Sequence, residues 1–528
     1  MTSVHPPRPA AGEDEMPQLS HREILVVVTG LLLGMLVAAL SQTIVATALP
    51  IIVGELGGQE QLSWVVSAAL LTTAASMPIW GKLSDLFGRK VPFQAAIALF
   101  LVASLASGFA QSMAQLVAFR AVQGIGMGGV MALSQAILGD VVSPRERGRY
   151  QGYLGSAFGF ATVAGPLAGG FLVDHLSWRW TFWAAVPIGI VALLVTERVL
   201  RLPFPRRRAT IDWVGAVLIV TSVSSLLLVL SLGGTEFPWN SPWTYGLLAV
   251  SLVTLLLAIA QERRAQEPIM PPRLFRSRTF VLASLASFAI GVAMFGAMIY
   301  LPQYLQIVKM QSPTVSGLLT VPLMVGVLGA SIISGRLISV TGRYKRYPVI
   351  GLLVAAGGLC LLSLLTVDTP LPLTGLYMFV TGVGIGMTMQ VLIVAVQNDV
   401  ARSDLGIATS SANFFRSLGG TVGVAIFGAL ITHRLAETIP ARLAEAGVTA
   451  AGRIAETPRL GTPAEIAQIP EPIHSAVLAG FADALDTTFL AAVPFALAGF
   501  AVVVFLREKP LRGPSVGPGR GDTQPESG

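Results

Sequence analysis

Charged residues are scarce in this chain, and they are unevenly spread. Only 12% of the 528 residues are Asp, Glu, Lys or Arg, against about 25% in a typical soluble domain. Long uncharged runs separate short clusters of charge. A helix of about 20 apolar residues crosses the hydrocarbon core of a bilayer, and backbone groups in lipid must pair within their own segment. The composition therefore predicts an all-α polytopic membrane protein rather than a soluble one.

Cysteine and histidine are also almost missing. The one cysteine, Cys360, lies in an apolar run, which excludes a disulfide within the chain and a thiolate metal cluster. The five histidines lie in the tails or at the ends of uncharged runs, namely His5, His21, His175, His433 and His474. We therefore expect no metal site in the membrane and no cofactor.

Acidic residues are outnumbered, because 28 Asp and Glu stand against 35 Lys and Arg, and the net charge is +7. A nucleic-acid-binding protein gathers such an excess on one face with interleaved aromatic residues. Here the basic residues are divided into one cluster per connection. We therefore expect no nucleic-acid partner and attribute the basic clusters to membrane topology.

The uncharged runs predict fourteen membrane-spanning helices. In chain order they cover 24–52, 61–80, 92–110, 114–138, 150–173, 180–197, 213–233, 244–261, 279–303, 315–335, 347–367, 372–397, 405–431 and 487–506. Connections after even-numbered runs hold most of the basic residues, whereas short connections after odd-numbered runs hold only Arg179 and Lys309. Because short basic loops stay in the cytoplasm, we predict a multi-pass protein of the cell membrane with both termini cytoplasmic.

The connection 432–486 differs from the others because it is long and mixes both signs of charge. Long loops cross the membrane largely regardless of charge, so we predict an outer loop here. Its segment 474–485 is either an amphipathic helix on the membrane surface or a solvated spacer.

An internal repeat divides the chain into halves. The stretch Gly81-Lys-Leu-Ser-Asp-Leu-Phe-Gly88-Arg89 recurs as Gly335-Arg-Leu-Ile-Ser-Val-Thr-Gly342-Arg343. Duplicated helical halves around a midplane site are the architecture of secondary transporters. We predict two six-helix bundles joined by two inserted helices. The predicted parts are a disordered tail 1–23, a first bundle 24–198, inserted helices 199–278, a second bundle 279–506 and a tail 507–528.

The stretch from Gly81 to Lys90 closely resembles the loop signature of the major facilitator superfamily. This resemblance implies the fold of that superfamily and a latch on the cytoplasmic side. In the latch, Asp85 is bonded across the interface between the halves in the outward-open state. The glycines Gly81 and Gly88 permit a tight turn, and Arg89 supplies charge that can pair with a helix end.

Two further segments resemble signatures of the same superfamily. Arg120 begins the run Arg120-Ala-Val-Gln-Gly-Ile-Gly-Met-Gly-Gly, which resembles the fourth-span signature, whose arginine is linked to proton transfer. Arg120 could equally bond carbonyl groups and fix its helix in place. The Gly-rich fifth run, with Gly165 and Pro166, resembles the signature of antiporters.

The segments 40–50 and 178–189 resemble motifs of the fourteen-span drug:proton antiporter subfamily. One departure matters, because that subfamily usually has an aspartate where this chain has Ser41. The other acidic residues considered, Asp140, Asp212, Asp399 and Asp486, lie near the ends of the predicted runs. We therefore hypothesise that proton coupling is weakened, or that it uses a boundary carboxylate such as Asp140.

A mid-helix arginine costs about 2.5–3.5 kcal/mol on insertion scales and should face the protein interior. Arg416 in the thirteenth run therefore either contacts substrate or fixes neighbouring helices. Methionine suits an adaptable apolar pocket, although helix packing explains such residues as well. The candidate substrate residues are Ser41, Gln42, Arg120, Met294, Met298, Gln303 and Arg416.

We predict a secondary active transporter, not an enzyme, that exports lipophilic small molecules by proton antiport. An exporter of a lipid or an endogenous metabolite on the same fold is the alternative. A membrane sensor or enzyme is a remote third hypothesis, since no cluster of His with Asp or Ser lies near the membrane. The expected partners are the small-molecule substrate, protons and membrane lipids, and we expect a monomer.

Overall fold

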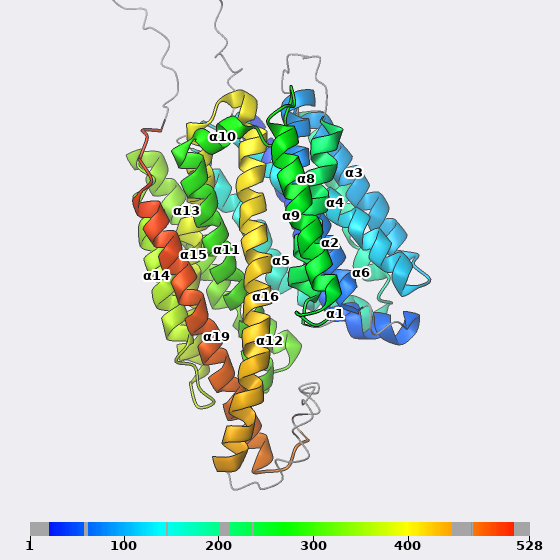
Figure 1. The fold of residues 1–528 in the computed structure, drawn as a ribbon, viewed down its shortest axis with the longest axis vertical. Coiled ribbons are helices and arrows are strands. Elements are labelled where there is room, and N and C mark those ends of the chain that lie inside the picture. Colours follow the sequence, from blue (N-terminus) through cyan, green and yellow to red (C-terminus); the bar gives the residue numbers. More distant parts are fainter. Residues whose placement is uncertain are drawn as a thin grey trace, which may run out of the picture.

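In the computed structural model the chain folds into a bundle of long helices (Figure 1). The structure describes residues 21–57, 62–143, 146–200, 212–234, 237–445, 466 and 468–511. The helices of the first half and the insertion are α1 (His21–Leu56), α2 (Leu62–Phe87), α3 (Lys90–Gly108), α4 (Met113–Val141), α5 (Arg147–His175), α6 (Trp180–Trp183), α7 (Ala185–Val199), α8 (Trp213–Leu232), α9 (Pro242–Glu262) and α10 (Pro272–Arg276).

The second half continues with a mostly helical series of similar length. Its elements are α11 (Arg278–Gln303), the π-helical turn η2 (Tyr304–Val308), α12 (Pro313–Leu319), α13 (Val321–Thr341), α14 (Arg346–Leu362), α15 (Leu371–Asp399), the short 3₁₀ turn η3 (Arg402–Asp404), α16 (Leu405–Glu445) and α19 (Ile473–Val504). Each run predicted from the sequence coincides with one of these helices or with two consecutive ones, which confirms the all-α membrane fold.

Side-chain caps start several of the helices. The hydroxyl or carboxylate at the N-cap accepts a backbone N–H bond three residues on, which satisfies one of the unpaired donors of the first turn. This arrangement occurs at Ser112, Asp212, Ser241, Ser277 and Ser312. The sequence thus marks these helix starts by polar residues directly before the apolar runs.

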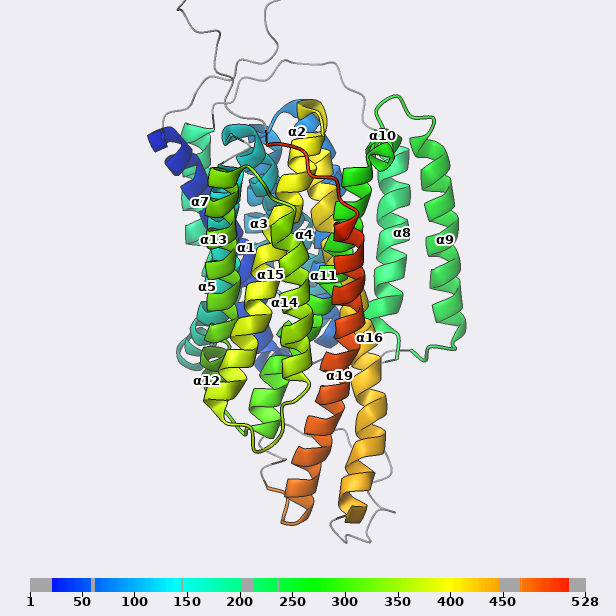
Figure 2. The ribbon, with the colours of Figure 1, turned by 90° about the vertical axis from the view of Figure 1, so that its left-hand side faces the viewer.

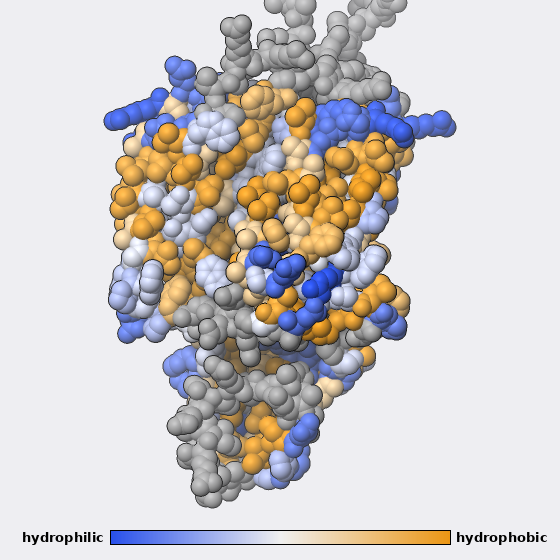
Figure 3. All heavy atoms as spheres, turned by 90° about the vertical axis from the view of Figure 1, so that its right-hand side faces the viewer, coloured by the Kyte–Doolittle hydropathy of each residue, from blue (hydrophilic) through white to orange (hydrophobic). Residues whose placement is uncertain are grey.

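Twelve of the described helices are long and apolar enough to cross a membrane. Hydrophobic side chains cover much of the face in Figure 3, and hydrophilic ones gather at its upper edge. The apolar helix α14 is shorter, with 17 residues, and the Gly-rich α5 is not among the twelve. The chain is therefore a multi-pass membrane protein, and the count of fourteen spans stays a prediction.

Five of the described helices form most of the contact between the two halves. Helix α13 packs on α5, and α16 packs on α2 and α4. We call the end of the bundle that carries α10 the α10 end, and the opposite end, where α16 and α19 project, the hairpin end (Figure 1). The link between α2 and α3 and the starts of α5 and α16 lie at the α10 end.

The inserted helices α8 and α9 stand at the side of the bundle (Figure 2). Helix α8 contacts both halves, because Leu227 and Val223 pack with Leu71 of α2 and Leu418 of α16. A helix that touches α2 and α16 together covers the lateral seam between the halves.

The outer loop predicted over 432–486 is wrong at both ends. Helix α16 has 41 residues and runs on to Glu445, and α19 has 32 residues and already begins at Ile473. At 1.5 Å per residue α16 is about 60 Å long, twice the roughly 30 Å of a bilayer core. The segment 474–485 is neither a surface helix nor a spacer, because it is part of α19. Most of 446–472 lies outside the described residues.

Apolar packing explains why these helices continue past the predicted boundaries. Ile439 and Leu443 of α16 are buried against Ala476 and Val477 of α19. Arg442 adds two bonds to Asp483, at 2.7 and 3.1 Å. The charges at the predicted boundary therefore lie on the exposed sides of a two-helix hairpin, and they do not end the helix.

Candidate gate and substrate site

Asp85 joins the two halves at the α10 end. Its two carboxylate oxygens accept the backbone N–H groups of Gly406 at 3.0 Å and Ile407 at 2.7 Å. Those groups belong to the first turn of α16, where unpaired donors and the helix dipole favour a negative charge. The carboxylate of the first half thus caps a helix of the second half, as the resemblance implied for the latch.

Arg89 binds two carboxylates beside this cap. Its Nη1 donates to Asp85 Oδ1 at 2.5 Å, and its Nε donates to Asp140 Oδ2 at 2.5 Å. Burial opposes the charge of the guanidinium, but Asp140 and Asp85 outweigh it, so the pKa of Arg89 is raised. Asp140 is the second-last residue of α4. It therefore lies at a helix end, as predicted, and is engaged in an ion pair.

Gly81 and Gly88, the two glycines predicted to belong to the latch, have separate roles. A Cβ at Gly81 would meet Ser410 Oγ at 1.9 Å and Gly406 O at 2.8 Å, so any side chain there would push α16 away. Gly88 has a φ of +84° in the turn between α2 and α3, a conformation that glycine adopts without strain.

A second set of bonds crosses the interface between the halves further inside. Arg147 Nη1 donates to Gln397 O at 3.3 Å. Gln397 Nε2 donates to Gln135 O at 3.0 Å, and Asn413 Nδ2 donates to Gln135 Oε1 at 2.9 Å. The sequence analysis missed these residues as a group. The sequence did contain a feature that could have identified them. Gln135, Gln397 and Asn413 are amides inside or at the ends of predicted spans, and buried amides need hydrogen-bond partners.

Helices α5 and α13 also touch at the α10 end. A Cβ on Gly335 would lie 2.2 Å from Gly148 O, so the two backbones pack directly on each other. Together with the Asp85 cap and the amide bonds, this contact closes the α10 end between the halves.

Arg120 lies inside the first half. It is 1% exposed, and its Nε donates to Val65 O at 3.1 Å while Nη1 donates to Gln123 Oε1 at 2.5 Å. Gln123 Nε2 donates in turn to Ser41 Oγ at 3.1 Å and to Ser104 Oγ at 2.6 Å. Of the two alternatives for Arg120, this geometry is that of a residue bonding a carbonyl group between helices.

Gly165 lies where α5 meets α1. A Cβ there would be 2.0 Å from Thr43 Oγ1, and that hydroxyl donates to Ala161 O of α5 at 3.0 Å. The side chain of Pro166 is outside the described part of the chain, and α5 continues through its position.

The remaining substrate candidates are not brought together into one group. Met294 is buried in a core cluster of the second half, and Met298 packs against the same cluster. Gln42 and Gln303 are half-buried. Arg416 is half-buried too, eleven residues into α16.

Asp486 was predicted to lie next to the start of a membrane-spanning run, and in the structure it lies within a longer helix. Because α19 begins at Ile473, Asp486 is well inside it, and its Oδ1 is buried without a hydrogen-bond partner. The early start of α19 is the reason for this difference.

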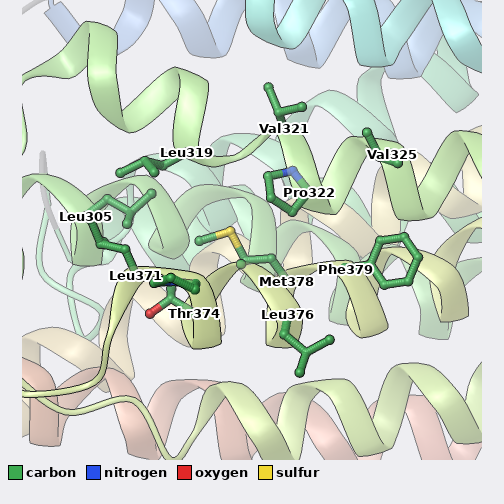
Figure 4. Close-up of a pocket in the computed structure, with 12 residues that line it drawn as sticks. Leu305, Leu319, Val321, Pro322, Val325, Leu371, Thr374, Leu376, Met378 and Phe379 are labelled. Carbon is green, nitrogen blue, oxygen red and sulfur yellow. The ribbon is translucent and has the colours of Figure 1, made fainter.

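An apolar groove of about 650 Å³ opens at the hairpin end between the first turns of α13 and α15 (Figure 4). Its walls include Leu305, Val321, Pro322, Leu371 and Met378, with Thr374 as a polar residue. The groove contains none of the substrate residues predicted from the sequence. Among the described residues, no group of three or more His, Cys, Asp or Glu could hold a metal ion.

A family model and individual proteins of similar sequence both match a transporter family. The family model described as Major Facilitator Superfamily matches residues 31–424. An uncharacterized MFS-type transporter of Mycobacterium tuberculosis is 40% identical over 495 residues, covering 94% of this chain and 71% of that protein. The multidrug transporter protein MdtP of Bacillus subtilis is 35% identical, covering 93% of this chain and 94% of its own length.

Solved structures share the fold at low sequence identity. The human organic anion transporter MFSD10 (TETRAN) has a TM-score of 0.60 and 16% identity, covering 91% of this chain and 99% of that one. The proton:xylose symporter XylE has a TM-score of 0.58 and 15% identity, covering 93% and 98%.

Proposed function

Since the chain belongs to the Major Facilitator Superfamily, we propose that it exports lipophilic small molecules across the cell membrane by alternating access. The efflux role is supported by the multidrug transporter and a multidrug resistance protein of Bacillus subtilis, which are 35% and 34% identical to this chain. We assign the α10 end to the cytoplasm, because the connections there carry the basic clusters.

One observation carries the mechanism: the Asp85 carboxylate caps α16 of the other half. In this conformation the cytoplasmic end is closed, so the molecule is in the state that releases substrate outward. Opening the cytoplasmic end must break this cap and separate Gly148 from Gly335. A substrate that binds one state more tightly than the other shifts the populations between them.

We further propose that proton antiport drives export. Its carrier is Asp140, whose ion pair with Arg89 spans two helices at the cytoplasmic end. Helix movement that opens the cytoplasmic end would separate Asp140 from the guanidinium. The carboxylate is then paired with Arg89 in one state and released from it in the other.

The test is export by the purified full-length chain in proteoliposomes with an imposed pH gradient. A panel of lipophilic cations, anions and neutral compounds should include at least one substrate, and collapse of the gradient should slow its transport. Asp140→Asn should leave transport insensitive to the gradient, with Asp483→Asn in the hairpin as the matched control. Transport no faster than in empty liposomes across the whole panel would contradict the proposed function.

A further inference from the structure

The connection from α9 to α10, together with α10 itself, lies at the α10 end of the bundle (Figure 2). We call residues 263–277 the strap. At one end the strap continues from the inserted helix α9, and at the other it passes directly into α11 of the second half. The backbone N–H groups of Ile269 and Met270 donate to the two carboxylate oxygens of Glu262, at 3.1 and 3.0 Å. The strap is therefore folded back onto the end of α9 by its own backbone.

The strap is bound to the first half near the end of α2. Lys82 Nζ donates to Glu267 Oε2 at 2.7 Å, and Lys82 is only 5% exposed. Ile79, on the preceding turn of α2, packs against the hydrophobic cluster that contains the buried Ile269 of the strap. Removal of one partner from a buried ion pair leaves the other charge without compensation. The position of Glu267 is therefore tied to that of α2.

The strap is also bound to the second half. Arg273 Nη2 donates to Asp404 Oδ1 at 2.7 Å, and Ser277 Oγ donates to Asp399 at the end of α15. Leu274 is buried in a hydrophobic cluster formed by α11, α14, α15 and α16. A segment that is bound in this way to both halves resists their separation at this end.

Both ionic contacts of the strap lie next to the Asp85 cap. Lys82 precedes Asp85 by three residues, which is about one turn of α2, and Asp404 precedes Gly406 by two. The cap joins the end of α2 directly to the start of α16. The strap joins the same two segments of the chain through Glu267 and Arg273, so the two connections act side by side.

Separation of the halves would break the strap contacts on one side. Helix α10 ends at Arg276 and α11 begins at Arg278, so α10 moves with the second half. Lys82 belongs to α2 and moves with the first half. The Lys82–Glu267 pair is therefore the ionic contact that opening removes, and a lysine that is buried in the closed state then loses its carboxylate.

We propose that the strap holds the α10 end closed and that the Lys82–Glu267 pair is its releasable bond. The segment that follows the inserted helices thereby takes part in gating, whereas α8 covers the lateral seam. The proposal rests on the alternating access of the proposed function. It concerns the equilibrium between two conformations, and it is tested without any transported compound.

The test measures closure by the labelling of a cysteine at the contact between α5 and α13. A Cβ on Gly152 would lie 3.2 Å from Ile332 Cα, so the thiol of Ile332→Cys in a Cys360→Ser background is covered while the halves are closed. The full chain in nanodiscs is treated with a soluble maleimide. Glu267→Lys places two ammonium groups beside each other and should raise the labelling rate by roughly fivefold or more.

Charge exchange separates the ion pair from a general loss of packing. Lys82→Glu should raise the labelling rate as Glu267→Lys does, and the double variant should return it to the rate of the unmodified chain. Arg273→Glu, which releases the strap from the second half, should raise the rate as well. Glu197→Lys is the matched control, because Glu197 also pairs with a lysine, Lys90, but both residues belong to the first half. Its labelling rate should equal that of the unmodified chain.

Unchanged labelling in either Glu267→Lys or Arg273→Glu overturns the proposal, and so does a double variant that labels as fast as the single ones. An equal increase in Glu197→Lys also overturns it, because charge reversal would then loosen the protein without regard to the strap. If labelling follows the expected pattern but no compound of the panel is transported, the strap stands and the export function fails. Transport with unaltered labelling in the variants has the opposite meaning.

Discussion

At the residue scale, the charged side chains inside the bundle differ in the groups to which they are bonded. Asp85 and Asp140 share Arg89 at a helix end, and Arg120 bonds a carbonyl group of α2. Arg416 is only half-buried, and among the described residues no hydrogen bond or ion pair holds its guanidinium. A charge without a partner in one state of a transporter is available for a partner in another state.

Asp85→Asn should impair transport without preventing insertion into the membrane. Asparagine can accept only one of the two bonds from Gly406 and Ile407, and it loses the charge that favours the helix N-terminus. Loss of roughly 1–3 kcal/mol from one state shifts the two populations about 5- to 150-fold toward the inward-open state. Turnover in proteoliposomes and cysteine accessibility at the cytoplasmic end measure this shift.

Wild-type turnover of reconstituted Asp85→Asn protein would contradict this role for the cap. Asp483→Asn is the matched control, because it also removes an arginine-bound carboxylate but lies in the hairpin.

Ser41→Asp should strengthen pH-driven export and extend it toward lipophilic cations. The new carboxylate would replace a hydroxyl bonded to Gln123, whose other end bonds Arg120. It would add a carboxylate next to Gln123 and Arg120, where the described part of the first half has none. Efflux of a lipophilic cation against a pH gradient measures the gain, and Ser41→Asn is the uncharged control. Robust proton-driven cation export by the unmodified chain, unchanged in Ser41→Asp, would refute the hypothesis.

The structure places Asp85 beside a helix end of the other half, where the short motif led us to expect it, and its role in gating stays a prediction. It left Arg120 open between two roles, since a sequence does not tell which carbonyl groups lie within reach. The bonds from Gln397 and Asn413 to Gln135 escaped prediction because they join residues 262 and 278 positions apart along the chain, and uncharged amides leave no charge pattern.

At the element scale, helix pairs approach closely only where glycine removes a side chain. Gly335 and Gly148 bring α13 and α5 into backbone contact. Rigid packing at such points means that the halves either close fully at the α10 end or stay apart.

Gly335→Val should hold the α10 end open, because a Cβ there overlaps Gly148 O at 2.2 Å. We expect a loss of transport of at least tenfold and increased labelling of cysteines placed between α5 and α13. Gly329→Val on the same helix is the control, since a Cβ there meets nothing within 4 Å. If both variants transport equally well, the contact between α5 and α13 is not required for closure.

Helix positions were predictable from uncharged runs, but helix ends were less so at α16 and α19. A run ends where the charges begin, whereas a helix continues as long as another helix covers its apolar side. Ile439 and Leu443 are covered by α19, and that pairing is invisible in a local window of sequence.

At the scale of the whole molecule, the basic clusters predict that the α10 end and both termini face the cytoplasm. In a Cys360→Ser background, which removes the one native thiol, single cysteines can be placed in chosen connections. Gly58→Cys and Asn240→Cys should react with an impermeant maleimide from outside intact cells, and Arg207→Cys should not. The reverse labelling at any of the three positions would overturn the proposed topology.

The projecting α16–α19 hairpin has a practical consequence for imaging. Two repeated halves inside a detergent micelle present nearly the same projection from opposite directions, which makes particle alignment in electron microscopy ambiguous. The hairpin belongs to one half only and projects past the ends of the other helices (Figure 2), so we expect it to stand outside the micelle. It therefore serves as a built-in fiducial marker, and an antibody fragment that recognises it would enlarge the particle without touching the gate.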